Sequence, residues 1–428
     1  MIAEIEFATA HNIKSFQEEK LKEQLRYLAK NSPFYKRLFS ENKLNIEAIN
    51  TLDDLPQIPT TSKADLQNFN DEFICIPKNE IADYSSTSGT ESQPVNFILN
   101  DSDLNRLAYN EAISFSCAGI QTGDVVQVMT TMDRRFMAGL AYFLGLRKLG
   151  AGVIRTGAGV PDFQLDSILR NQPKYLIAVP SFLIKLIKLA EERGIDLNKT
   201  SLKAAICIGE PLRNQDFSPL TLSQRIQEKW NIKLFSTYAS TEMSTAFTEC
   251  EMHHGGHEHP ELIITEILDD NDKPVTEGEL GELTITTLGV QGMPLLRYKT
   301  GDIVRKHSEP CSCGRHSSRI GPVVGRKKQM IKYKGTTLFP LAIQDVLNNF
   351  NEIYGHIVEI STSELGTDHV KLMIFAPNQP ENFTKKLSER LRSKIRVVPE
   401  ISLISEEKLN MLVMPTGSRK PKVVIDLR

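Results

Sequence analysis

The sequence predicts an α/β protein in which a large N-terminal domain is followed by a small α+β C-terminal domain. Before residue 262, β-branched runs alternate with segments whose apolar residues recur every three or four positions, which is typical of parallel strands joined by helices. From residue 262 the pattern of apolar residues changes to runs that suit antiparallel strands, and past residue 325 a separate series of helices and strands begins. We therefore expect mixed, mostly parallel sheets covered by helices, a β subdomain, and a small α+β unit.

The elements of the large domain follow from this alternation. We expect a charged helical segment within 12–50, a helix start at Ser62, and a helix at 101–120. Later in the sequence, strands are expected at 125–129, 175–179, 204–208 and 232–235, and helices at 136–149, 181–193 and 220–230. Pro180 is expected to open the second of these helices, because proline is favoured at the first helical position. Runs at 263–268 and 282–288 then suit antiparallel strands.

The small domain is predicted from a shorter series of about 100 residues. Its helices are expected at 340–350 and 383–395, and its strands at 357–361, 370–375 and 401–404. A basic loop at 415–422 precedes a last apolar run at 423–427.

Composition narrows the function classes. The 428 residues are 40% hydrophobic and 24% charged, which is ordinary for a globular protein of two or three domains. The formal net charge of −2 gives no global case for nucleic acid or a membrane surface. No apolar run reaches the length of a spanning helix, and the acidic N-terminus lacks a signal pattern. Six cysteines are too few for a disulfide scaffold, so we expect a cytoplasmic protein.

A run of hydroxyl side chains around a glycine, Tyr84 to Thr90, is the first candidate site. Hydroxyls and a glycine backbone can approach phosphate oxygens closely and donate hydrogen bonds to them. No Gly-Lys-Ser/Thr follows, so the stretch is not a Walker loop. By itself, the pattern is more typical of a solvated loop than of a phosphate site.

Two later stretches place carboxylates where ligands can bind. Glu242 closes Tyr-Ala-Ser-Thr-Glu, which follows the strand at 232–235, and the carboxyl ends of strands are where open α/β sheets bind ligands. Its oxygens suit Mg²⁺, although a turn glutamate is the alternative. Asp302 closes Arg-Tyr-Lys-Thr-Gly-Asp, where a carboxylate fixed beyond a strand suits ribose hydroxyls and a plain β-turn is the alternative.

The cysteines supply a separate signal. Cys311-Ser-Cys313 lies in a proline- and glycine-flanked turn, and Cys250 precedes several histidines. Three thiolates and one imidazole fit a tetrahedral zinc site, and a full set of protein ligands indicates a structural role. The candidate imidazoles are His253, His254, His257 and His259. The other cysteines, Cys75, Cys117 and Cys207, fit ordinary core positions.

In this order, the stretches resemble the adenylate-forming acyl-CoA ligases, most closely their phenylacetate-CoA ligase-like branch, over essentially the whole chain from Asn31 to Arg428. The motifs are Ser86-Thr-Ser-Gly-Thr, Tyr238-Ala-Ser-Thr-Glu, Arg297-Tyr-Lys-Thr-Gly-Asp, Gly325-Arg-Lys-Lys-Gln and a lysine near the C-terminus, Lys420. The resemblance implies the adenylate-forming enzyme fold, with a large domain at 1–326, its zinc-binding β region at about 250–313, and a small mobile domain at 327–428.

The implied reaction joins a carboxylic acid, by default an aryl or arylacetic acid, to ATP, and passes the acyl group from the acyl-adenylate to coenzyme A, with release of pyrophosphate and AMP. ATP, Mg²⁺, coenzyme A and a structural Zn²⁺ are the implied cofactors, and a homodimer is implied by resemblance alone. The resemblance also assigns residues, named here in order along the chain: Ser86, Thr87, Ser88, Gly89 and Thr90 to the phosphates; Gly209, Glu210 and Pro211 to the adenine edge; Tyr238, Ala239, Ser240 and Thr241 to adenine; Glu242 to Mg²⁺; Asp302 and Arg326 to the ribose; Lys328 to the hinge; Gly335 to the pantetheine tunnel; Lys420 to the reacting carboxylate and α-phosphate; and Cys250, His257, Cys311 and Cys313 to zinc.

The chain departs from the family pattern in three places. Glu91-Ser92-Gln93 replaces the usual Thr-Gly-Lys of the phosphate loop, which removes a lysine and adds a carboxylate that would repel a triphosphate. Lys328-Gln329 stands where the hinge often carries two acidic residues, and Val423 replaces an arginine, so Lys422 is a rival to Lys420. These changes leave two alternatives open: delivery of the acyl group to an acceptor other than CoA, such as a carrier protein, or a degenerate nucleotide-binding protein without turnover.

The acyl pocket is the least specified part of the chain. Family pockets draw on the helix near Phe136, the turn at 179–181 and the strand end at 239–240. Arg134 and Arg135 precede that helix, and they either meet a carboxylate or phosphate of a substrate or cap the helix surface.

Overall fold

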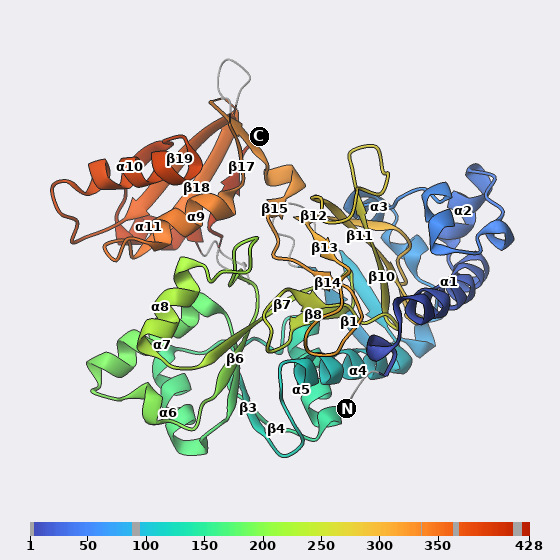
Figure 1. Cartoon of the computed structure of the whole chain (residues 1–428), viewed down its shortest axis with the longest axis horizontal. Helices are drawn as coiled ribbons and strands as arrows, with labels where there is room; N and C mark the ends of the chain where they lie inside the picture. The colour runs from blue at the N-terminus through green and yellow to red at the C-terminus, as the bar shows by residue number, and fades with distance from the viewer. Residues whose placement is uncertain (1–3, 88–94, 335, 363–367, 414–421) are drawn as a thin grey trace.

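The computed structural model describes residues 4–87, 95–334, 336–362, 368–413 and 422–428 (Figure 1). Ser88, Gly89 and Thr90 of the predicted phosphate loop lie outside these ranges, as do Glu91, Ser92, Gln93, Gly335 and Lys420. The helices run as follows: α1 Ala10–Asn31, α2 Pro33–Glu41, α3 Lys63–Asn68, α4 Asp101–Cys117, α5 Met137–Leu149, α6 Pro161–Asn171, α7 Pro180–Glu192, α8 Thr221–Lys229, α9 Pro340–Asn348, α10 Phe383–Ile395 and α11 Glu406–Val413.

The strands join into several sheets. A long sheet has the order β13-β14-β9-β8-β7-β6-β5-β3-β4, an antiparallel sheet the order β10-β11-β12-β15, and the C-terminal sheet the order β20-β19-β18-β21; β1 pairs with β2 and β16 with β17. The bounds are β1 Asp83–Ser86, β2 Asn96–Leu99, β3 Val125–Val128, β4 Gly152–Arg155, β5 Tyr175–Ala178, β6 Ala204–Cys207, β7 Lys233–Ser240, β8 Thr245–Glu249, β9 Gly256–His257, β10 Ile263–Leu268, β11 Gly281–Thr287, β12 Tyr298–Val304, β13 Lys306–His307, β14 Arg319–Ile320, β15 Gly325–Arg326, β16 Ile331–Tyr333, β17 Thr336–Leu338, β18 Gly355–Thr362, β19 Asp368–Phe375, β20 Glu400–Leu403 and β21 Val424–Asp426.

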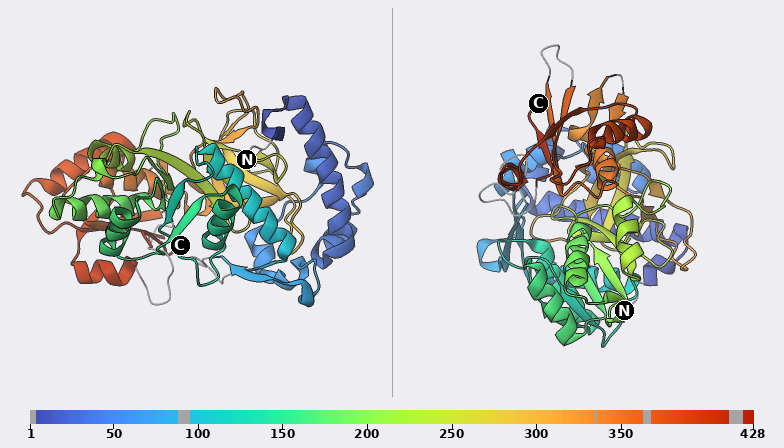
Figure 2. Two further views of the ribbon diagram at one scale, coloured as in Figure 1. Left: turned by 90° about the horizontal axis from the view of Figure 1, so that it is seen from below. Right: turned by 90° about the vertical axis from the view of Figure 1, so that its left-hand side faces the viewer.

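The parallel part of the long sheet is covered on both faces, as the sequence predicts. Strands β4, β3, β5, β6 and the start of β7 pair in parallel. Alternate residues of one strand enter opposite cores: Leu176 packs with the helices α6, α7 and α8, while Ile177 packs with α4 and α5. This is the period-two alternation of a strand buried on both faces. Figure 2 shows the helices on either side of this sheet.

The N-terminal helices cover the antiparallel sheet. Helix α1 has Thr9 as its N-cap, and α2 begins with Pro33 behind the N-cap Ser32. Leu21, Leu25 and Leu28 of α1 share one buried cluster with residues of β10 and β11. The antiparallel pairing of β10 with β11 confirms the predicted change to antiparallel strands from residue 262.

The C-terminal unit has its own core. A buried cluster draws its members only from residues between Ile331 and Val424, including residues of α9, α10, β18 and β19. Strands β18 and β19 are antiparallel, while β21 runs parallel to β18 and β20 parallel to β19. Figure 1 places this unit beside α7 and α8, and an Asn349 side-chain amide donates to the Thr221 hydroxyl at 2.9 Å.

Several predicted elements need correction. The strand at 232–235 is longer, because β7 continues to Ser240 by switching from parallel pairing with β6 to antiparallel pairing with β8. The sequence analysis missed β4, α6 and α11. Helix α6 opens with Pro161, and its apolar side chains Leu165 and Ile168 carry the helical spacing that could have identified it. None of the helices within the described residues combines the length and apolar composition of a membrane span.

Candidate functional site

The described ends of the predicted phosphate loop are held together by hydrogen bonds. Ser86 and Thr87 are buried, and the Thr87 amide donates to the Val95 carbonyl at 3.0 Å while the Val95 amide donates to the Thr87 hydroxyl at 3.0 Å. The Ser86 amide donates to the carbonyl of Arg135 at 3.0 Å. The chain therefore enters and leaves the loop at one fixed base, where residues 95 and 87 face each other.

The segment before α5 lies against this base. Arg134 and Arg135 are exposed and hold left-handed backbone conformations, with φ of 56° and 59°. The Arg135 guanidinium donates to the side-chain carbonyl of Asn96, at the start of β2, at 3.2 Å.

Asp302 lies inside a strand and not in a turn, which corrects the turn interpretation. It belongs to β12, beside Gly301 with φ of 80°, where the register with β11 shifts between Glu282 and Thr284. This bulge aims a nearly buried carboxylate, 9% exposed, toward β7. Its Oδ2 accepts from the Tyr238 hydroxyl at 2.6 Å, and its Oδ1 lies 3.5 Å from Nε of Arg326.

These three residues come from three separate motifs. Burial raises the pKa of Asp302, while the charge of Arg326 and the Tyr238 hydrogen bond oppose that rise. The Tyr238 ring stacks on Phe247, with centroids 5.9 Å apart. Tyr238 thus offers a fixed aromatic ring next to a fixed carboxylate.

The rest of the Tyr-Ala-Ser-Thr-Glu motif forms the end of β7 and the turn into β8. The Met243 amide donates to the Ser240 hydroxyl at 3.3 Å, and the Ser244 hydroxyl donates to the Thr241 carbonyl at 3.3 Å. Ala239 is exposed and Glu242 is half-buried in this turn. Burial and then the charge of Glu242 raise the pKa of Tyr298, so Glu242 lies near the start of β12.

Gly209, Glu210 and Pro211 follow β6, and Gly209 has a left-handed φ of 76°. The Glu210 carboxylate accepts from the amide and the hydroxyl of Ser181, both at 2.8 Å, at the start of α7. Burial raises the pKa of Glu210 against these two hydrogen bonds. Glu210 therefore caps α7, and the backbone of Gly209 is the part of this loop that is exposed at the surface.

The boundary between the units carries its own contacts. Arg326 is exposed and pairs in register with Asp302, and Lys328 is exposed in the short helical turn Lys327–Gln329. Lys327 binds carboxylates of the large unit, while Arg428 donates to the Lys328 carbonyl at 2.8 Å.

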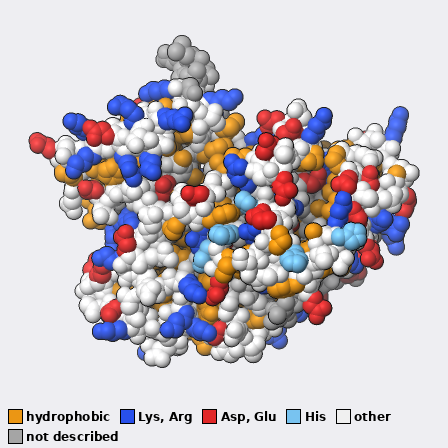
Figure 3. All heavy atoms as spheres, in the orientation of Figure 1, with side chains coloured by type: hydrophobic (Ala, Val, Ile, Leu, Met, Phe, Trp, Pro, Cys, Tyr) orange, Lys and Arg blue, Asp and Glu red, His pale blue; other side chains and the backbone are white. Residues whose placement is uncertain are grey.

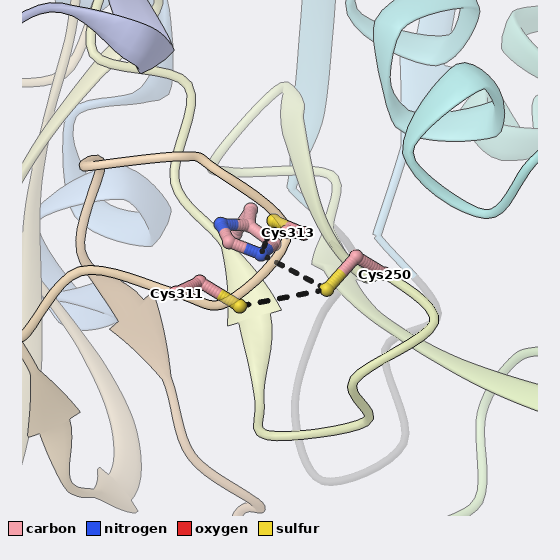
Figure 4. Close-up of side chains that lie close together, drawn as sticks. Cys250, Cys311 and Cys313 are labelled. Carbon is pink, nitrogen blue, oxygen red and sulfur yellow. Dashed lines mark hydrogen bonds between the residues drawn. The ribbon is translucent and has the colours of Figure 1, made fainter.

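The predicted metal ligands form one cluster, in which Cys250, His257 and Cys311 are buried and Cys313 is half-buried. The ligand atoms of Cys250, His257, Cys311 and Cys313 all lie within 4.8 Å of one another. Cys250 Sγ is 3.7 Å from Cys311 Sγ, and His257 Nε2 is 3.3 Å from Cys250 Sγ and 3.5 Å from Cys313 Sγ (Figure 4). In a tetrahedral zinc site with Zn–S bonds of about 2.3 Å, neighbouring sulfurs lie about 3.8 Å apart, so these spacings fit Zn²⁺.

The competing histidines have other partners. His253 approaches Glu249 at 3.3 Å and packs on Phe235, and His254 packs on Phe217. His259 lies between the Ser114 hydroxyl, at 2.8 Å, and the carboxylate of Glu6. Of the four candidates, His257 is the one whose ring faces the sulfurs.

Basic groups favour thiolates in the cluster. Burial raises the pKa of the Cys313 thiol, but hydrogen bonds with His257 and with the backbone and guanidinium of Arg315 outweigh it and bring that pKa to about 5. Burial lowers the pKa of His257, and its contacts with the cysteines raise it to about 10. Thiolates are the form of cysteine that binds metals.

The sequence analysis missed the groups that support this cluster. Arg315 Nε binds Glu6 at 2.6 Å, and Glu6 also accepts the amide of His316 on its backbone carbonyl at 2.7 Å. Cys117 is buried, as predicted for a core cysteine, but it packs against Cys250 and Cys311. Arg315 follows Cys313 within two positions, which is a signal that sequence reasoning could have used; Glu6, some 300 residues away, gives none.

Comparisons with known proteins agree with this geometry. The model of the family described as "AMP-binding enzyme" matches residues 11–292. The phenylacetate-coenzyme A ligase of Thermus thermophilus is 29% identical over 376 residues, covering 87% of this chain and 83% of that protein. The phenylacetate-coenzyme A ligase of Pseudomonas putida is 27% identical over 416 residues, covering 93% and 92%.

A solved structure shows the same fold. The structure of 2-hydroxyisobutyryl-CoA ligase in the postadenylation state, in complex with 2-HIB-AMP, has a TM-score of 0.86 and 23% identity, covering 99% of this chain and 91% of that one. The family model spans most of the large unit and well over half of the whole chain. The chain therefore belongs to the AMP-binding enzyme family, and within it to the phenylacetate-CoA ligase-like branch of the adenylate-forming acyl-CoA ligases, which are AMP-forming acid–CoA ligases.

Proposed function

We propose that this ligase activates an aryl or arylacetic acid, with phenylacetate as the default substrate, and transfers the acyl group to coenzyme A. The names of the relatives at 29% and 27% identity support an aromatic acid. In the first step the acid carboxylate attacks the α-phosphate of ATP, forming the acyl-adenylate and pyrophosphate. In the second step the CoA thiol attacks the acyl carbon, forming the thioester and releasing AMP.

The arrangement of Tyr238, Asp302 and Arg326 is the observation that carries this proposal. A carboxylate has two oxygens with about four acceptor sites, and Tyr238 uses one of them. The remaining sites suit the paired hydroxyls of a ribose, and the Tyr238 ring offers a surface for the attached adenine. The exposed Arg326 guanidinium adds a positive charge beside the same carboxylate.

The chemistry requires positive charge and hydrogen-bond donors, because it brings a carboxylate to a polyphosphate. We assign the loop residues 86–90 to the phosphates, Glu242 to holding Mg²⁺, and Lys420 to the reacting carboxylate and α-phosphate. When bound, Mg²⁺ would neutralise phosphate charge. Glu242 lies in the β7–β8 turn near β12, which supports its assignment to the same site as Asp302.

We also propose that 1–326 and 327–428 are two domains that rotate about Lys328 between the two steps, with Gly335 lining the pantetheine tunnel in the second. The separate core of the small unit supports this division. Lys and Arg side chains gather over the outer face of that unit in Figure 3, which suits a substrate with phosphates such as CoA.

For the Cys250, His257, Cys311 and Cys313 cluster we propose a structural Zn²⁺. Four protein ligands, three of them buried and Cys313 half-buried, leave no open coordination position for a substrate. When bound, the ion would tie the loop that carries Cys311 and Cys313 to the end of β8.

A panel of acids tests the substrate. Purified protein is incubated with ATP, Mg²⁺ and each of a set of aromatic and aliphatic acids, with and without CoA, and pyrophosphate, AMP and acyl-CoA are measured. We expect phenylacetate or another aryl acid to give acyl-CoA in amounts equal to AMP. Turnover with aliphatic acids alone would overturn the aromatic assignment, and acid-dependent adenylation that CoA does not discharge would favour a carrier-protein acceptor.

Size-exclusion chromatography of the same preparation tests the expected homodimer, and cell fractionation tests the expected cytoplasmic location.

A further inference from the structure

We propose that Arg428 is a positioning residue for the adenylation step: it fastens the predicted hinge to the strand that follows the predicted catalytic lysine. This inference rests on the proposed function, since it concerns how Lys328 and Lys420 act together. The inference goes beyond the proposed function because it names the side chain, Arg428, that couples the hinge to the lysine.

The Arg428 guanidinium contacts three segments of the small unit. It donates to the backbone carbonyls of Lys328 and Met330, both at 2.8 Å. It also binds the carboxylates of Asp426 at 2.6 Å and Asp368 at 3.0 Å. Its side chain is 19% exposed, and hydrogen bonds between a guanidinium and carboxylates are among the stronger ones in proteins.

The residue just before the hinge is fastened to the other unit. Lys327 Nζ lies 2.8 Å from Asp270 and 3.0 Å from Glu282, and both carboxylates belong to the large unit. Two consecutive residues are therefore bound to different units: the Lys327 side chain to the large unit, and the Lys328 carbonyl to the small unit. A rotation of one unit against the other is therefore confined to the bonds around Lys328.

Arg428 also follows, two residues on, the strand that leads away from the predicted catalytic lysine. Strand β21, Val424–Asp426, begins four residues after Lys420 and pairs in parallel with β18. The Leu427 amide continues this pairing by donating to the Ile360 carbonyl at 2.8 Å. Through Arg428, the hinge backbone and β21 form one rigid piece, so each rotational position of the hinge corresponds to one position of the chain that leaves Lys420.

The coupling should matter more for the step that uses the lysine. Arg428→Ala would free the Lys328 and Met330 carbonyls, and Lys420 would reach the α-phosphate less often. We expect the rate of adenylation with phenylacetate to fall by about tenfold or more, in line with the loss of charged hydrogen bonds. Thioester formation from synthetic phenylacetyl-adenylate and CoA should fall less than about threefold, because that step does not need the lysine. Arg428→Lys should retain only part of the wild-type adenylation rate, since one ammonium group cannot reach both carbonyls and both carboxylates.

The control is Lys371→Ala. Lys371 pairs with Glu400 at 3.0 Å in the same unit, with no contact to the hinge among the described residues, so it removes a charge without touching the coupling. It should leave both half-reactions unchanged. Equal losses of both half-reactions in Arg428→Ala, or no loss in either, would overturn the proposal.

Hydrogen–deuterium exchange gives a readout that does not depend on activity. Arg428→Ala should speed exchange at least about tenfold in both 327–334 and 422–428, and Lys371→Ala should not. Unchanged exchange in the hinge would refute the coupling whatever the activity. If the wild type adenylates no acid while exchange rises as expected, the proposed function fails and the coupling stands.

Discussion

The Tyr238 hydroxyl donates a 2.6 Å hydrogen bond to the Asp302 carboxylate, across 64 positions of sequence. Tyr238 lies in the second half of β7 of the long sheet, and Asp302 lies at a bulge in β12 of the antiparallel sheet. This charged hydrogen bond joins the two main sheets of the large unit. Its carboxylate is the group that we assign to the ribose.

We predict that Tyr238→Phe weakens AMP binding by about threefold to tenfold. The change keeps the ring that stacks on Phe247 and removes only the donor that holds Asp302, and a hydrogen bond to a charged group contributes about 1.5–3 kcal/mol before relaxation. Asp302→Asn should weaken binding more, because it also removes a charge and replaces an acceptor oxygen. Calorimetric titration with AMP measures both; a Tyr238→Phe protein that binds AMP like the wild type would disprove the positioning role of this bond.

For the cysteine–histidine cluster, we predict about one zinc per chain in the purified protein. Cys313→Ser should abolish the zinc content and lower the melting temperature, because four ligands hold the ion and one of the thiolates is lost. Cys75→Ser is the matched control, since that half-buried cysteine lies outside the cluster and should leave the zinc in place. Elemental analysis by mass spectrometry gives the stoichiometry, and full zinc content in Cys313→Ser would rule out this ligand set.

We predict that Arg135 supplies part of the positive charge that the phosphate loop lacks. The loop carries Glu91-Ser92-Gln93 without a lysine, and Arg135 lies at its base, where its exposed guanidinium donates to the side-chain oxygen of Asn96. Arg135→Ala should weaken ATP binding by about threefold to tenfold and leave AMP binding unchanged, because AMP has no β- or γ-phosphate. Arg134→Ala, one residue away, is the control. Equal losses for ATP and AMP would contradict this role.

The sequence predicted the architecture well because its signals are local. Parallel strands buried on both faces appear as continuous apolar runs, as in Tyr175–Ala178, and a proline at the first helical position marks the start of α7. The cysteine spacing likewise identified a set of side chains that lie together.

What the sequence missed depends on pairing between distant segments. Nothing in the local pattern around Asp302 distinguishes a bulged strand from a turn, because Thr-Gly-Asp suits both, and the register with β11 decides it. The length of β7 was underestimated for the same reason, since its second half is polar and is held by β8. The contacts of Glu6 with Arg315 and of Arg428 with Lys328 join residues about 300 and 100 positions apart and leave no local trace.

The measurement that tests the central claim most directly is acid-dependent exchange of labelled pyrophosphate into ATP. It requires that the enzyme form an acyl-adenylate and reverse that step, so a protein that only binds nucleotide cannot give it. We predict exchange that depends on Mg²⁺ and on phenylacetate or another aryl acid, that proceeds without CoA, and that is lost in Lys420→Ala. ATP binding with no exchange for any acid in the panel would contradict adenylation by this chain and leave a nucleotide-binding protein without turnover.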